Sequence, residues 1–135
     1  DSRISWFNVG EYKSRKNMVG DLITTPPEKV KSTIEKLLNE YNKKQTVSFD
    51  DILDFHVKFE RIHPFQDGNG RVGRIIMFKE CLKYNIVPFI IEDNLKMYYY
   101  RGLKEWDNEK GYLRDTCLTA QDRYKQYLDY FEIKY

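Results

Sequence analysis

Residues 63–74 gather side chains that could do chemistry on a phosphate, in the order HPFQDGNGRVGR, just before a stretch of helical character. The N-terminus of a helix presents unpaired backbone N–H groups and the positive end of the helix dipole, so it favours anions. Gly68 and Gly70 are expected to take positive φ and let a ligand approach the backbone. Arg71 and Arg74 add forked donors suited to phosphate oxygens. The segment therefore predicts a polyphosphate site.

Two further side chains complete this chemistry. Asp67 is the only carboxylate of the segment. A single carboxylate beside phosphates is the usual way of holding Mg²⁺, which takes its other ligands from phosphate and water. His63 can accept a proton, because an unperturbed imidazole has a pKa of about 6.5 and much of it is neutral at cellular pH. A base beside a metal-bound phosphate indicates attack on that phosphate by a hydroxyl group. The alternative interpretation of this segment, a capped helix start with an incidental glycine turn, would explain the glycines but not the His, the Asp and the two Arg that accompany them.

The elements that must position these side chains are mostly helices. β-formers around Gly20 and Asp21, stopped by Pro26 and Pro27, predict a short hairpin over residues 17–25. Apolar residues at helical spacing predict five helices, near residues 29–44, 50–62, 69–82, 93–106 and 113–131. Pro27 would lie in the first turn of the first helix.

The pattern within these predicted helices also indicates which residues are buried and which cap the helices. Val30, Ile34, Leu37, Leu38 and Tyr41 would form the buried face of the first helix. Ser48 and Asp50 are candidate caps of the second helix, and the third, apolar almost all round, would be surrounded by other helices. His56 is expected to be a hydrogen-bonded core residue. The expected fold is all-α with one small β-hairpin, in a single domain over residues 1–135.

Composition narrows the class of protein. Of 135 residues, 41% are apolar and 33% charged, which is the balance of a globular domain, and a net charge of +2 without a basic stripe argues against a nucleic-acid binder. No apolar run is long enough to cross a bilayer. Cys81 and Cys117 stand far apart in apolar stretches and are expected to be reduced core thiols. We expect a cytoplasmic, bacterial protein that binds neither nucleic acid nor membrane.

Residues 63–74 match every fixed position of the motif H-x-F-x-(D/E)-G-N-G-R-x-x-R, and the chain is thereby identified as similar to the Fic family. Eight fixed positions in a window of twelve make a specific signal. The resemblance extends to the residues 10–13, 19–27, 56–62 and 99–103, and it implies a Fic-type helical bundle with a hairpin flap. Its implied activity is Mg²⁺-dependent transfer of AMP from ATP to a Ser, Thr or Tyr hydroxyl of a protein.

The resemblance implies a role for each matching residue. His63 would deprotonate the target hydroxyl, and Asp67 would hold the Mg²⁺ bridging the α- and β-phosphates. Phe65 would anchor the loop in the core. The anion hole and the phosphate contacts would come from Gly68, Asn69, Gly70, Arg71 and Arg74, with Asn69 near the α-phosphate and Arg74 at the γ-phosphate.

Three further implications follow from the resemblance. Gly70 favours AMP transfer, because the related Doc toxins carry Lys there and transfer the γ-phosphate. Tyr100 and Leu103 would line the nucleotide pocket, while Asp107 stands where many members contact adenine through Asn. The flap at residues 17–25 would hold a segment of the target protein by strand addition.

Many Fic proteins carry an inhibitory helix with the pattern (S/T)-x-x-x-E-(G/N), whose Glu pairs with the second motif Arg. Only Thr24 has Glu at this spacing, and Lys29 follows it, so the pattern is not met. We expect the helix upstream of Asp1, in a longer chain of which this is a fragment, or in a separate antitoxin. This form should then be derepressed and modify itself. The alternatives are removal of AMP, transfer of another nucleotidyl or phosphoryl group, and a nucleotide-binding interaction module.

Overall fold

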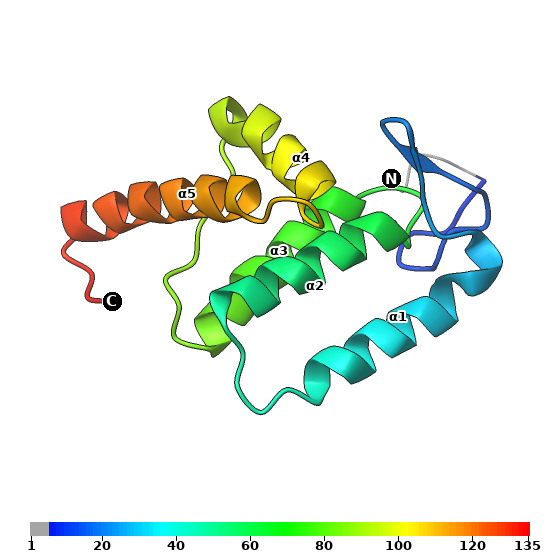
Figure 1. Ribbon diagram of the computed structural model, residues 1–135, viewed down its shortest axis with the longest axis horizontal. Helices are drawn as coiled ribbons and strands as arrows, with labels where there is room; N and C mark the ends of the chain where they lie inside the picture. The colour runs from blue at the N-terminus through cyan, green and yellow to red at the C-terminus, as the bar shows by residue number, and fades with distance from the viewer. Residues whose placement is uncertain (1–5) are drawn as a thin grey trace. The chain divides into compact units, whose positions relative to one another are not determined.

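The computed structural model describes residues 6–135, which are mostly helical (Figure 1). Five α-helices, one short 3₁₀ helix and one antiparallel pair of strands make up this part of the chain, which confirms the prediction of an all-α fold with a small hairpin. The chain forms two compact units. The first runs to Val47 and includes Asp54–Ile75; the second combines Ser48–Leu53 with Ile76–Tyr135. The single catalytic domain over residues 1–135 stays a prediction.

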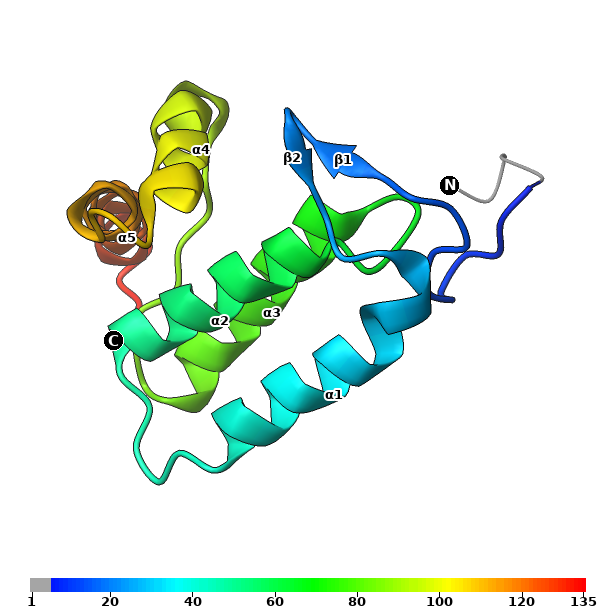
Figure 2. The ribbon, with the colours of Figure 1, turned by 45° about the vertical axis from the view of Figure 1, so that its right-hand side comes forward.

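The hairpin of the first unit forms where the β-formers predicted it. Strand β1 (Met18–Val19) pairs antiparallel with β2 (Leu22–Ile23), with Met18 opposite Ile23 and Val19 opposite Leu22. Gly20 has φ of +59°, as the first central residue of a two-residue type II′ turn requires. The result is a short two-stranded arm, which Figure 2 shows from the side.

Helix α1 (Pro27–Asn42) follows the hairpin, and Pro27 is its first residue, as predicted. The buried face contains Val30, Ile34, Leu37 and Tyr41. Leu38 was predicted on this face and is instead exposed. At about 100° per residue, position 38 lies roughly 80° around the helix from position 30, at the edge of the apolar stripe.

Helices α2 (Phe49–Ile62) and α3 (Asn69–Lys83) flank the loop that carries the motif, and both views show them side by side (Figures 1 and 2). Gly73 permits a close approach of the two helices, because a Cβ there would lie 3.1 Å from Cδ1 of Phe59. His56 is fully buried with its Nδ1 3.2 Å from the Gly73 carbonyl oxygen. Burial lowers the pKa of His56 to about 4, so its ring is neutral, and the prediction of a hydrogen-bonded core histidine is confirmed.

The expectation that α3 is surrounded on all sides is wrong. Met77 and Cys81 are buried, whereas Ile75 is 61% exposed and Leu82 is also exposed. One stripe of this apolar helix therefore faces outward, because its apolar residues cover more of its circumference than the buried face needs.

In the second unit, the 3₁₀ helix η1 (Asp93–Leu95) leads into α4 (Lys96–Glu105), which packs against α5 (Gly111–Tyr130). Gly102 allows this packing, since a Cβ there would lie only 2.6 Å from the Cα of Leu113. Cys81 and Cys117 are buried free thiols, as predicted, and burial raises the pKa of the Cys81 thiol to about 11. No helix among residues 6–135 combines the length and the apolar character that crossing a membrane requires.

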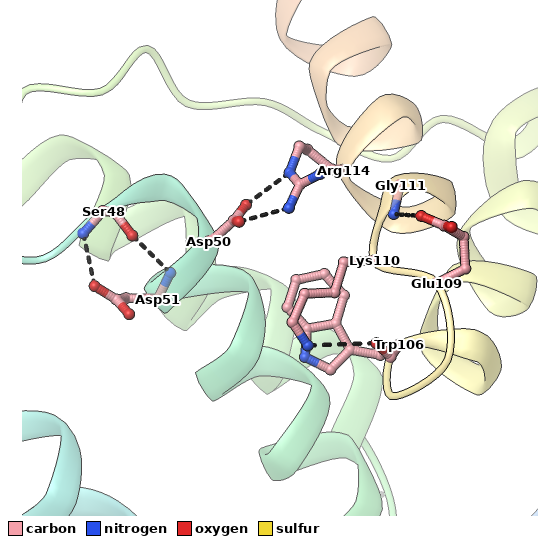
Figure 3. Close-up of polar contacts among 8 residues, drawn as sticks. All are labelled: Ser48, Asp50, Asp51, Trp106, Glu109, Lys110, Gly111 and Arg114. Carbon is pink, nitrogen blue, oxygen red and sulfur yellow. Dashed lines mark hydrogen bonds and ion pairs between the residues drawn. The ribbon is translucent and has the colours of Figure 1, made fainter.

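The first turn of α2 belongs to this second unit, and its predicted caps separate into two roles (Figure 3). The Ser48 hydroxyl accepts from the Asp51 N–H at 3.1 Å, while the Asp51 carboxylate accepts from the Ser48 N–H at 2.9 Å, which is a reciprocal capping box. Asp50 was predicted as a cap and instead accepts two hydrogen bonds from Arg114, at 2.9 and 2.6 Å. Asp50 does not cap because it is already the second residue of α2, after the capping Ser48, and its carboxylate pairs with the guanidinium of Arg114 in α5.

Candidate active site

The loop between α2 and α3 reverses the chain through two left-handed residues. His63 has φ of +51° directly after α2, and Gly68 has φ of +79° directly before α3. A non-glycine residue at positive φ carries steric strain, and such strain gathers at functional sites. Gly70 was expected to share this conformation, but it does not: it lies within the first turn of α3. Because Gly70 has no side chain, the guanidinium of Arg74 can lie against its backbone; a Cβ at this position would be 2.8 Å from Nη1 of Arg74.

His63 is held in a state suited to accepting a proton. Its backbone N–H donates to the Phe59 carbonyl at 3.0 Å, so the residue closes the last turn of α2. Burial lowers the pKa of His63, the positive charge of Lys13 lowers it further, and the Glu60 backbone carbonyl offsets part of this. The ring nitrogen Nδ1 is buried and has no hydrogen-bond partner among the described residues. Burial and the charge of Lys13 therefore both favour the neutral imidazole, the form that accepts a proton.

The side chain of Asn69 fixes the loop. It is 2% exposed, its Oδ1 accepts from the Phe65 N–H at 2.7 Å, and its Nδ2 donates to the Phe65 carbonyl at 2.7 Å. Phe65 was expected to anchor the loop in the core, but it is only half-buried, with its ring against Tyr12, and Pro64 is the fully buried residue of the loop. With the Asn69 amide engaged, the residue has its backbone N–H at the helix N-terminus to offer a phosphate.

Three predicted ligand residues line one cleft. Asp67, Gly68 and Arg71 border a space of about 560 Å³, together with residues 7–11 on the opposite side. The polar groups in this cleft are a carboxylate, which can ligate a cation, and two anion-binding groups, a guanidinium and the N-terminal end of α3. This set fits a nucleotide polyphosphate with Mg²⁺. No cluster of three or more His, Cys, Asp or Glu side chains capable of holding a metal occurs in residues 6–135. A cation here would thus need phosphate and water ligands beside Asp67.

His63 and Arg74 do not line this cleft. Both lie near Glu60, a residue that the sequence analysis missed: the Glu60 backbone carbonyl acts on His63, and the Glu60 carboxyl group interacts with the charge of Arg74. Burial raises the pKa of Glu60 to about 7, although the positive charge of Arg74 acts in the opposite direction. The Oε1 atom of Glu60 is buried without a hydrogen-bond partner in the described chain. The sequence signal that could have found it is a Glu in the predicted second helix, four residues after His56 and three residues before His63.

The residues expected at the nucleoside lie in the second unit. Tyr100 and Leu103 belong to α4, where Tyr100 is 52% exposed and Leu103 half-buried, while the neighbouring Tyr99 is buried. Asp107 follows the end of α4 and is exposed. Their contact with adenine stays a prediction.

Comparisons with known proteins agree with this architecture. The model of the Fic/DOC family matches residues 2–81. A Fido domain-containing protein of Dictyostelium discoideum is 31% identical over 140 residues, covering 92% of this chain and 94% of that protein. A protein adenylyltransferase Fic of Nematostella vectensis is 32% identical over 104 residues, which is 72% of this chain and 23% of that protein. The crystal structure of a Fic domain containing signaling protein from Bacteroides thetaiotaomicron has a TM-score of 0.68 at 26% identity, covering 93% of this chain and 51% of that one.

The protein is mostly helical, and a glycine-containing turn leads into α3. A histidine, a carboxylate and two arginines lie in this turn and in the first turns of that helix. The chain belongs to the Fic/DOC family. It spans 23% of the length of the Nematostella adenylyltransferase and 19% of that of a Caenorhabditis elegans one. Membership of the family therefore does not by itself assign the activity of those longer proteins to this chain.

Proposed function

We propose that this protein transfers AMP from ATP to a Ser, Thr or Tyr hydroxyl of a protein. The observation that carries the proposal is the position of His63 at the end of α2, in the loop whose Asp67, Gly68 and Arg71 line a cleft at the start of α3. Burial lowers the pKa of His63, which favours its proton-accepting form. The names of several relatives as protein adenylyltransferases support it.

In the proposed reaction His63 takes the proton of the target hydroxyl, whose oxygen bonds to the α-phosphorus of ATP. The bond from that phosphorus to the oxygen bridging the α- and β-phosphates breaks, and pyrophosphate leaves. Backbone N–H groups of Gly68, Asn69 and Gly70 would stabilise the charge on the α-phosphate, because a helix N-terminus leaves them unpaired. Arg71 and Arg74 would bind the remaining phosphates.

Asp67 would hold Mg²⁺, since its carboxylate is exposed at the cleft and is the only one in residues 63–74. The cation would neutralise charge that develops between the α- and β-phosphates. The nucleoside is proposed to contact Tyr100 and Leu103.

The hairpin would dock the target. Its strands are short and present apolar side chains outward: Met18, Leu22 and Ile23 are all exposed, Ile23 to 77%. An exposed strand edge can pair with an extended segment of another protein, so main-chain hydrogen bonds would place the target hydroxyl. An inhibitory helix, in the same protein or in an antitoxin, would oppose binding of the γ-phosphate of ATP by pairing a Glu with Arg74. The two buried free thiols support a cytoplasmic location, where thiols stay reduced.

The test follows each phosphate of ATP separately. The protein is incubated with Mg²⁺ and ATP labelled at the α- or the γ-phosphate, with and without cell lysate, beside His63→Ala and the size-conserving His63→Asn. We expect α-label on protein, no γ-label, and loss of α-label in both variants while their thermal unfolding stays cooperative. Transfer of the γ-label would indicate phosphoryl transfer instead. ATP binding by calorimetry with no label on any protein, lysate included, would indicate a binding module.

A further inference from the structure

Lys13 is a buried lysine that neither the motif nor any predicted role includes. It precedes the hairpin in the first unit and is 4% exposed. Lysine side chains are almost never fully buried unless their charge is paired or hydrogen-bonded. Burial lowers the pKa of its ammonium group. The position of its Nζ therefore calls for a physical explanation.

The acceptors of the Lys13 ammonium come from two separate segments. Nζ donates to Oδ1 of Asn17 at 2.6 Å and to the Thr24 hydroxyl at 2.9 Å, at the two ends of the hairpin. Its third hydrogen bond goes to the carbonyl of Ile62 at 3.2 Å, the residue before His63. An ammonium has three donors, so all three are used. The Lys13 backbone N–H adds a bond to the Pro64 carbonyl at 2.8 Å.

Asn17 extends this connection toward α3. Its Nδ2 donates to the carbonyl of Phe65 at 3.0 Å, and the same carbonyl accepts from Nδ2 of Asn69. Asn69 is the first residue of α3. A continuous chain of hydrogen bonds thus runs from the base of the hairpin, through the loop after His63, to the helix N-terminus.

Gln66 provides a second tie between the same segments. Its Oε1 accepts from the backbone N–H groups of Ser14 and Arg15, each at 3.1 Å. These contacts are exposed at the surface, unlike those of Lys13, so water competes for them and they hold the segments less firmly.

We infer that Lys13 is a positioning residue that fastens the hairpin to the loop of His63, so that a hydroxyl docked on the hairpin meets the base and the helix N-terminus in one fixed geometry. The inference rests on the proposed function for its consequence in catalysis. The fastening itself is a property of the folded chain without any ligand. Removing the ammonium would take the Lys13 donor from the Ile62 carbonyl and the Thr24 hydroxyl and leave Asn17 Oδ1 with the Thr24 hydroxyl as its donor, so the hairpin would move independently of the loop.

The test replaces Lys13 by Met, which keeps the stem and removes the donors. Lys36→Met, at an exposed position of α1, is the matched control. Thr24→Val keeps the side-chain shape and removes one acceptor of Nζ together with the hydrogen bonds that the Thr24 hydroxyl donates to Asn17. The first measurement is the ¹⁵N order parameter of the backbone amides at residues 17–24 and at residues 63, 65 and 66, since Pro64 has no amide N–H. We expect a fall from about 0.85 to below about 0.6 at both segments in Lys13→Met, and no change in Lys36→Met. Thr24→Val should loosen residues 17–24 and leave residues 63–66 rigid.

The second measurement is α-label transfer at a series of ATP concentrations. We expect the rate in Lys13→Met to fall on the order of 100-fold, the effect of misplacing reacting groups by about 1 Å, with the apparent KM for ATP unchanged. A fall in rate with an equal rise in that KM would indicate general damage to the site and overturn the inference.

Order parameters decide the question even if the wild-type protein transfers no AMP. Values in a folded Lys13→Met that match the wild type would overturn the inference, and so would an equal fall throughout α1. If Lys13→Met does not fold, Thr24→Val decides: loosening confined to the hairpin supports the inference, and an unchanged hairpin refutes it.

Discussion

Replacing Glu60 by Gln is expected to stabilise the protein above pH 7. The Glu60 carboxyl is largely buried between α2 and the start of α3, its Oε1 lacks a hydrogen-bond partner among the described residues, and its pKa is raised from 4.5 to about 7. Ionising this group therefore costs more in the folded than in the unfolded protein. Gln has the same shape and stays neutral, so the variant avoids that cost.

The sign and size of this difference in stability follow from the pKa values of Glu60 in the unfolded and folded states. Below pH 4.5 Glu60 is protonated in both states, and the variant has no advantage from this term. Between pH 4.5 and 7 the unfolded chain releases the proton while the folded protein keeps it, so the contribution of Glu60 to stability is lost as pH rises. Above pH 7 the loss is complete and amounts to about 3 kcal/mol, at roughly 1.4 kcal/mol for each tenfold difference in proton affinity.

Urea unfolding at pH 4, 5, 6, 7 and 8 would measure the free energy of unfolding of the wild type, Glu60→Gln and a control, Glu35→Gln, on an exposed position of α1. The difference between Glu60→Gln and wild type should grow through the window from pH 4.5 to 7 and then level off. A difference that stays constant with pH would refute the reasoning, because the carboxyl would then titrate alike in both states. Glu35→Gln should show no growth over this window.

Two further outcomes are expected. Gly73→Ala should lower the free energy of unfolding by about 1–3 kcal/mol, because the new methyl group would overlap Oε1 of Glu60 and lie 3.1 Å from the Phe59 ring where α2 and α3 meet; unchanged urea unfolding would show that the helices can separate without cost. Lys13→Met should raise the pKa of His63, followed by proton NMR of the two imidazoles, because the ammonium charge depresses it; a His63 pKa that stays the same would assign the depression to burial alone.

The helices and the hairpin followed from the sequence because their causes are local. The 3.6-residue period placed α1, α2 and α5 to within a few residues, and Gly20 between β-formers placed the turn of the hairpin. The fixed residues of the motif likewise predicted the loop and the start of α3 at Asn69. The spacing of apolar residues alone did not predict which face of each helix other elements would bury. Leu38 and Ile75 were therefore expected to be buried and are exposed.

The tertiary structure decided which polar groups meet. Lys13 and Ile62 are 49 residues apart, and no local pattern reveals that a lysine before the hairpin reaches the end of α2. The burial of Glu60 beside Arg74 depends in the same way on how closely two helices pack at Gly73. Residue types and their spacing thus determined the chemistry this protein carries. Packing decided the protonation of its base and the partners that hold it, because desolvation and hydrogen bonding depend on neighbours distant in the chain.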